Sequence, residues 1–142
     1  MHNHSCTILV VKTPLDAVRA LFRALEAGQT GDALAVHFDP EARQLEYPSL
    51  IGPQVRERGL ADILAASVAG AGLLVDQRYD EVEALEIGNR AIVRLTWSAT
   101  VSRDLAQFTA GQRLSSHVAL FATVRDGRVL HQASYDCYEP FS

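Results

Sequence analysis

The feature that most constrains the fold of this chain is a change of hydrophobic period after Gly72. Beyond it, apolar and polar residues alternate, most plainly in AIVRLTWSATVS at 91–102, as they do along a half-buried strand. The pairs Gly88-Asn89 and Asp126-Gly127 are typical of two-residue hairpin turns. The C-terminal half therefore predicts an antiparallel meander of four long strands, over 73–87, 91–102, 111–127 and 128–138.

The N-terminal half carries helical signals instead. In TPLDAVRALFRALEAGQ at 13–29, Thr13 can cap a helix and Pro14 suits its first position. Apolar residues then recur every three or four positions and form one stripe. Two shorter helices are predicted at about 32–37 and at 59–70, with a strand at 41–48 between them. This order predicts an α+β fold, in which a curved antiparallel sheet wraps around three N-terminal helices and leaves a cone-shaped cavity.

Composition and charge exclude several classes of partner. A chain of 142 residues with 48% hydrophobic residues is expected to form one soluble domain. Its net charge of −4 and scattered arginines provide no basic stripe, so we expect no nucleic-acid partner. No segment has the length of a membrane span or the pattern of a signal peptide, so we expect no membrane partner. Cys6 and Cys137 lie far apart and predict free thiols in a reducing, cytoplasmic compartment.

The first twelve residues are expected to form an N-terminal extension. His2, His4 and Cys6 could bind a metal ion in principle, but terminal residues are usually mobile, which favours a frayed end. Elsewhere there is no metal-ligand spacing, phosphate-binding loop or nucleophile elbow. We therefore expect a site without metal or cofactor.

Five stretches of the chain together resemble one known family. They are FRALEAGQTGDALAVHFDPEA, the strand ending in EYP, the helix containing ILAA, the strand through Trp97, and VALFATVRDGRVLHQASYD. In this order they resemble the SnoaL-like branch of the nuclear transport factor 2-like superfamily, with residues 1–142 as a single domain. The resemblance implies a cone of three helices and a curved sheet, and a homodimer formed through the outer face of that sheet.

The same resemblance does not imply one reaction, because the superfamily includes ketosteroid isomerases, polyketide cyclases, limonene epoxide hydrolases and proteins that only bind or scaffold. The isomerases' helix-one tyrosine corresponds to Leu21, and their general-base aspartate corresponds to Tyr47, beside Glu46. A tyrosine with an ordinary pKa near 10 is a poor base at neutral pH. The epoxide hydrolases' Arg-x-Asp pair is matched only by Arg94-Leu95-Thr96, without the carboxylate. The departures from the isomerase pattern argue against isomerase activity.

Asp136 is the candidate acid or base. The last-strand aspartate of the polyketide cyclases corresponds to a place near Ser134, and Asp136 lies two residues on, facing the same side about 6–7 Å further along. His117 on the neighbouring strand could meet Asp136 across the hairpin as an oriented base. The alternatives left open are a solvent-exposed or arginine-paired Asp136 and a His117 on the surface or the dimer face.

Tyr47, Trp97 and Phe22 are the candidate substrate-binding residues, since aromatic rings suit the wall of an apolar pocket; packing in the core is the alternative. The first functional hypothesis is an enzyme that moves a proton on, or adds water to, a small and mostly apolar molecule without a cofactor. The second is a non-catalytic domain on the same scaffold that binds a ligand or a protein.

Overall fold

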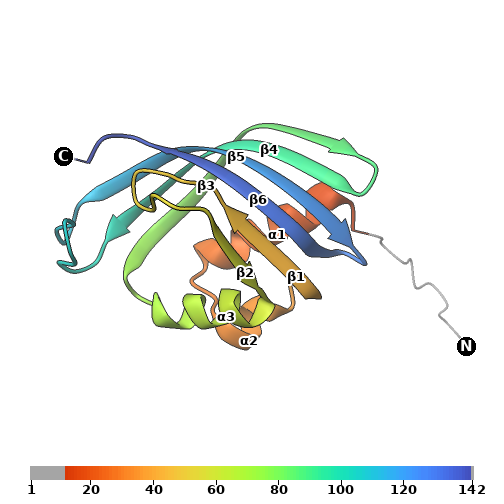
Figure 1. Cartoon of the computed structure of the whole chain (residues 1–142), viewed down its shortest axis with the longest axis horizontal. Helices are drawn as coiled ribbons and strands as arrows, with labels where there is room; N and C mark the ends of the chain where they lie inside the picture. Colours follow the sequence, from red (N-terminus) through yellow and green to blue (C-terminus); the bar gives the residue numbers. More distant parts are fainter. Residues whose placement is uncertain (1–11, 142) are drawn as a thin grey trace, which may run out of the picture.

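The structure is a computed structural model that describes residues 12–141, and it confirms the α+β class (Figure 1). Apart from Lys12, the expected N-terminal extension, with His2, His4 and Cys6, lies outside the described residues. Within that range no helix is long and apolar enough to cross a membrane. In chain order the elements are α1 (Pro14–Glu26), α2 (Gly31–Ala35), β1 (Phe38–Glu46), β2 (Arg56–Gly59), α3 (Leu60–Ala69), β3 (Leu74–Ile87), β4 (Arg90–Val101), β5 (Arg113–Arg125) and β6 (Arg128–Tyr138).

The strands form one curved sheet in the order β2-β1-β6-β5-β4-β3. Strands β3 to β6 make the predicted antiparallel meander. The expectation of a purely antiparallel sheet was wrong in one respect, because β1 runs parallel to β6. After β1 the chain passes through β2 and α3 to the opposite edge of the sheet, where β3 begins the meander. The meander ends with β6, which lies beside β1 and runs in the same direction. Strand β2 was not predicted, because its sequence RERG has no apolar alternation and the strand forms through backbone pairing with β1.

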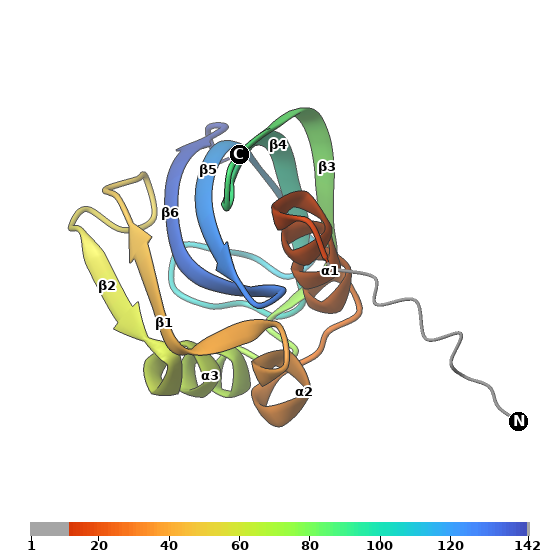
Figure 2. The ribbon, with the colours of Figure 1, turned by 90° about the vertical axis from the view of Figure 1, so that its right-hand side faces the viewer.

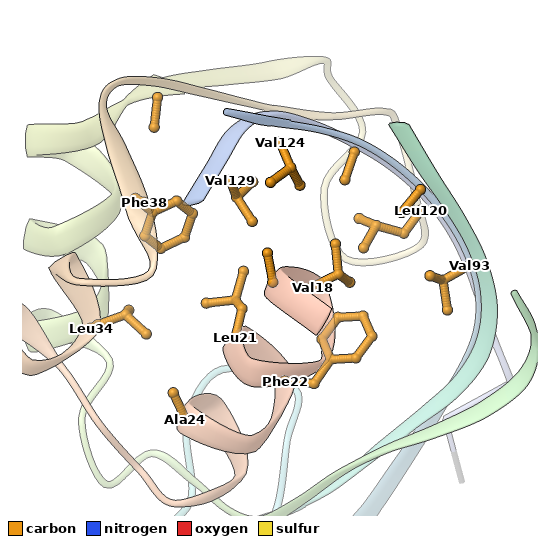
Figure 3. Packing of buried hydrophobic residues seen from close by; sticks show 14 of the residues in the cluster. Val18, Leu21, Phe22, Ala24, Leu34, Phe38, Val93, Leu120, Val124 and Val129 are labelled. Carbon is orange, nitrogen blue, oxygen red and sulfur yellow. The ribbon is translucent and has the colours of Figure 1, made fainter. Parts of the chain in front are cut away.

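Helix α1 begins at the predicted cap. The Asp16 backbone N–H donates to Thr13 Oγ1 at 3.1 Å, and Asp16 Oδ2 accepts from the Thr13 N–H at 3.2 Å, which completes a capping box. The apolar stripe of α1 faces the sheet. Figure 3 shows Val18, Leu21 and Phe22 packed towards Val93, Leu120, Val124 and Val129, all of which are buried. This packing fills one part of the concave side and leaves the rest for a cavity.

The curvature of the sheet gives it an inner and an outer face, with the helices on the inner side (Figure 2). The register between β5 and β6 is unbroken from Ser116, opposite Tyr138, to Thr123, opposite His131. Because side chains alternate between the two faces of a strand, even-numbered residues of this stretch point inward and odd-numbered residues point outward. This alternation decides which side chains reach the cavity.

Candidate active site

A cavity of about 270 Å³ lies between α1 and the concave face of the sheet. Part of its wall is apolar and comes from α1, β4 and β5: Phe22, Leu25, Leu95, Val118 and Leu120. The remaining wall is polar and comes mainly from β1, β5 and β6, which contribute Glu46, Ser116, Gln132, Asp136 and Tyr138 among others. A pocket with an apolar body and a few convergent polar groups is the usual form of a small-molecule site.

Asp136 is a half-buried carboxyl in this wall, opposite Val118 of β5. It makes no hydrogen bond or ion pair with any residue in the described part of the chain. Burial, and to a smaller extent the negative charge of Glu46, together raise the pKa of Asp136 from its ordinary value of 3.8 to about 6. With that pKa the group is about nine-tenths ionised at pH 7, so it can accept a proton and return it.

Glu46 lies beside Asp136 but in a different electrostatic setting. It is opposite Ser134 in the parallel β1–β6 pair, one inward position from Asp136. Arg58 of β2 donates from Nη1 to Glu46 Oε1 at 2.6 Å, and also to Gln44 Oε1 at 3.3 Å. Arg58 of the edge strand β2 therefore pairs with Glu46, whereas no cation within residues 12–141 pairs with Asp136. Two neighbouring carboxyls in such different environments can take different roles in acid–base chemistry.

The aromatic side chains that line the cavity are held in place by hydrogen bonds to Gln77 and by contacts between their rings. Trp97 Nε1 donates to Gln77 Oε1 at 3.1 Å, and the Tyr79 hydroxyl donates to the same oxygen at 3.4 Å. Phe22 stacks on Tyr79 with ring centroids 4.9 Å apart, and the Tyr138 ring meets Trp97 edge-on at 6.1 Å. Burial raises the pKa of both Tyr79 and Tyr138, so their hydroxyls stay neutral and remain hydrogen-bond donors.

Three of the predicted site residues, Asp136, Trp97 and Phe22, line the cavity together. Tyr47 does not line it. Its ring stacks on Tyr135 with centroids 4.4 Å apart, and it borders a small adjoining pocket of about 40 Å³ that shares Glu46, Asp136 and Tyr138 with the cavity.

The hypothesis that His117 pairs with Asp136 does not fit the structure. His117 pairs with Cys137, which is the residue after Asp136 on β6. Because the register is unbroken, His117 therefore lies on the outer face and Asp136 on the inner face. The ring is exposed, and its Nε2 lies 2.7 Å from Glu139 Oε2. The geometry matches the alternative of a surface histidine.

Several cavity residues were not among the predicted site residues: Glu46, Tyr79, Ser116, Gln132 and Tyr138. The signal that could have found the last three is the inward alternation they share with Asp136. Ser116 Oγ and Gln132 Oε1 are buried and have no hydrogen-bond partner among the described residues.

Other parts of the described surface hold fewer groups that could act on a ligand. In residues 12–141 no group of three or more His, Cys, Asp or Glu side chains is placed to hold a metal ion. A broader depression of about 830 Å³ is lined by Lys12, His37 and Arg128 among others, and shares no lining residue with the cavity. Burial lowers the pKa of His37 there, which favours its neutral form. The cavity around Asp136 is therefore the candidate active site.

Comparison with known proteins gives the family. The model of the SnoaL-like domain matches residues 18–132. The proposed polyketide cyclase IdmH from Streptomyces antibioticus is similar in structure, with a TM-score of 0.71, 18% identity, and coverage of 88% of this chain and 92% of that one. A proposed isomerase from Rhodopseudomonas palustris has a TM-score of 0.67 and 21% identity, with 92% of each chain covered. The proposed hydroxylase AclR from Streptomyces galilaeus has a TM-score of 0.66 and 18% identity, with 87% of this chain and 77% of that one covered.

At these identities the structural neighbours establish the fold and leave the reaction open. No protein of curated function matches the chain by sequence. The family model spans most of the chain, and the three helices and curved mixed sheet agree with it. The chain therefore belongs to the SnoaL-like domain family, within the nuclear transport factor 2-like superfamily.

Proposed function

We propose that the protein is an acid–base catalyst that needs no cofactor and acts on a small, mostly apolar molecule, with Asp136 as the group that moves the proton. The observation that carries this proposal is the placement of Asp136 in the cavity wall, half-buried, beside Glu46 and without a partner among the described residues. The pKa of Asp136 is raised by its partial burial, yet no protein group in the described part of the chain pairs with its carboxylate. An unpaired carboxyl is instead free to engage a ligand.

The cavity supplies what such a reaction requires. Its apolar wall, formed in part by Leu25, Leu95 and Val118, can hold the body of the molecule and exclude water from the reacting carbon. The ionised Asp136 would take a proton from a carbon next to a carbonyl group and then return it as the acid. The neighbours described as a polyketide cyclase and an isomerase support a reaction of this class.

The proposal is tested by hydrogen–deuterium exchange on a panel of cyclic ketones in D₂O, followed by proton NMR. We expect the protein to accelerate exchange at the carbon next to the carbonyl, with a rate that rises through a pKa of about 6. Asp136→Asn should lower that rate by about a hundredfold or more. Asp32→Asn, at an exposed position of α2, makes the same change away from the cavity and should keep the rate. An Asp136→Asn variant that exchanges as fast as the wild type refutes the role of Asp136.

A second candidate function is non-catalytic ligand binding on the same scaffold. It is favoured by the absence, among the described residues, of a side chain that orients Asp136, and by the outward direction of His117. A ketone that raises the melting temperature without any exchange would support this candidate over the catalyst, because binding to the folded state alone is enough to stabilise it.

A further inference from the structure

Three aromatic residues lie in one row across the inner face of the sheet. The register pairs Tyr79 of β3 with Trp97 of β4, and Ser116 of β5 then stands between Trp97 and Tyr138 of β6. All four residues line the cavity. The Trp97 and Tyr138 rings meet at an interplanar angle of 80°, with their centroids 6.1 Å apart. Two rings at nearly a right angle form a corner, and the faces of aromatic rings attract cations.

The ionised groups of the cavity wall are negative. Glu46 and Asp136 are its carboxyls, and the lining residues within the described part of the chain include no lysine, arginine or histidine. Arg58 of β2 pairs with Glu46 at 2.6 Å, whereas no cation within residues 12–141 pairs with Asp136. The wall therefore holds one carboxylate whose charge the described residues leave uncompensated.

This negative charge acts on the aromatic row. Burial, and to a smaller extent the charges of Asp136 and Glu46, raise the pKa of the Tyr138 hydroxyl. The same two charges contribute, again after burial, to the raised pKa of Tyr79. Tyr138 also lies two residues after Asp136 on β6 and therefore shares its face of the strand. The rings and the carboxyls thus converge on one region of the cavity.

Ser116 adds an unpaired dipole in the middle of the row. Its side chain is 1% exposed, and its Oγ has no hydrogen-bond partner among the residues that the structure describes. Buried polar atoms without a partner are rare in folded proteins. A hydroxyl can rotate, so the negative end of its dipole is free to turn towards a positive charge in the cavity, without direct contact. Ring faces, a free dipole and a nearby carboxylate all favour a cation here.

These features distinguish between classes of ligand. An anion would be repelled by Glu46 and Asp136, and a neutral molecule would leave the charge of Asp136 uncompensated. A metal ion needs several ligands, and within residues 12–141 no group of three or more His, Cys, Asp or Glu side chains is placed to supply them. An organic ammonium ion needs no such set, because ring faces and one carboxylate are enough to stabilise its positive charge.

We propose that the cavity binds an organic cation, with an ammonium group against the Trp97 and Tyr138 rings beside Asp136, and an apolar body along Leu95 and Val118. The apolar wall removes the surface of the body from water, and the ammonium group compensates the carboxylate. This ligand class rests on the proposed function for the identity of the site, although binding does not require proton transfer. A bound cation also keeps Asp136 ionised, which is the form that accepts a proton.

Titration calorimetry at pH 7.5 with two compounds of one shape tests the cation. The first is 4-(hydroxymethyl)benzyltrimethylammonium, and the second is 4-neopentylbenzyl alcohol, its isostere, in which a carbon atom replaces the charged nitrogen. We expect the ammonium compound to bind about tenfold more tightly. The isostere is the more hydrophobic of the two, so an apolar cavity without cation recognition would favour it. An ammonium compound that binds no more tightly than its isostere, or not at all, overturns the proposal.

Variants assign the preference to the wall. Asp136→Asn removes the charge but keeps the shape and should lower the preference about tenfold, whereas Asp32→Asn, at an exposed position of α2, should keep it. Tyr138→Leu should lower the preference severalfold, and Tyr138→Phe, which retains the ring, should keep it. Binding of the isostere checks that the cavity is intact in each variant; if Tyr138→Leu loses it, Asp136→Asn alone decides. A preference that is unchanged in the intact variants overturns the proposal.

Ketone exchange, the readout of the proposed function, separates the two ideas. Where ketones exchange, the ammonium compound should inhibit exchange competitively, because both occupy one cavity; binding without inhibition places the cation elsewhere and overturns the proposal. Exchange without an ammonium preference refutes the cationic ligand alone. An ammonium preference without exchange on any ketone refutes the catalytic role alone.

Discussion

Replacing Asp136 with asparagine should stabilise the protein at neutral pH and leave its stability unchanged in acid. Asparagine has nearly the same shape but carries no charge at any of these pH values. In the folded wild type the pKa of Asp136 is raised from 3.8 to about 6, mainly by burial, so the folded state holds a proton that the unfolded chain has already released. The carboxyl therefore costs stability as the pH rises from about 4 to about 6, and the cost is complete above pH 6.

The size of this effect follows from the pKa. At 1.36 kcal/mol per pH unit, the rise corresponds to about 3 kcal/mol for a group fully shielded from solvent. Asp136 is only half-buried, so water screens part of the penalty, and we expect about 1.5 kcal/mol. The free energy of unfolding of Asp136→Asn should thus equal that of the wild type near pH 4 and exceed it by this amount at pH 7.

The measurement is urea denaturation of both proteins at half-unit steps between pH 4 and pH 8. Other titrating groups, such as Asp39 beside Arg125, are present in both proteins and cancel in the difference. Asp32→Asn controls for the replacement of an exposed aspartate. A difference that does not change with pH, or an asparagine variant that is less stable at pH 7, refutes the reasoning.

Three further predictions concern the rest of the molecule. Arg125 donates two hydrogen bonds to Asp39 and lowers the pKa of that carboxyl, so Arg125→Gln should destabilise the protein at pH 7, with a loss that shrinks as the pH falls below about 4; urea denaturation at pH 7 and pH 3 checks this. His117→Ala should leave ketone exchange within about twofold of the wild type, because the ring lies on the outer face; a hundredfold loss by NMR would restore it as a catalytic candidate. We expect a homodimer through the outer face, where Phe121 meets the 43% exposed Tyr135, and Phe121→Arg should give a monomer by light scattering; a monomeric wild type at micromolar concentration contradicts this.

The elements that follow from local pattern were predictable from the sequence. The capping residues and apolar stripe of α1 determine that helix, and alternation together with the turns at 88–89 and 126–127 determines the meander. The same alternation puts Asp136 on the side of β6 that Ser134 faces, and the resemblance to the polyketide cyclases made Asp136 the candidate acid or base. The short strand β2 was not predictable, because its pairing depends on β1 and not on its own residues.

The site itself depends on relations between strands that are distant in sequence. Nothing local to Glu46 indicates that β1 pairs in parallel with β6, or that Arg58 reaches it from β2. The pairing of His117 with Asp136 failed for a related reason: a shift of one residue in register moves a side chain to the opposite face, and only the assembled sheet fixes that register.

By itself, then, the sequence determined the helices, the meander, the α+β class and the family resemblance, because these depend on periodicity, caps and turns within single segments. The tertiary structure decided that Asp136 faces a cavity beside Glu46 and that His117 faces outward. It also decided that Ser116 and Gln132 are buried without partners among residues 12–141. Burial, electrostatic coupling and unmet hydrogen bonds arise only when strands from different parts of the chain close around one space, so no single segment of the sequence carries them.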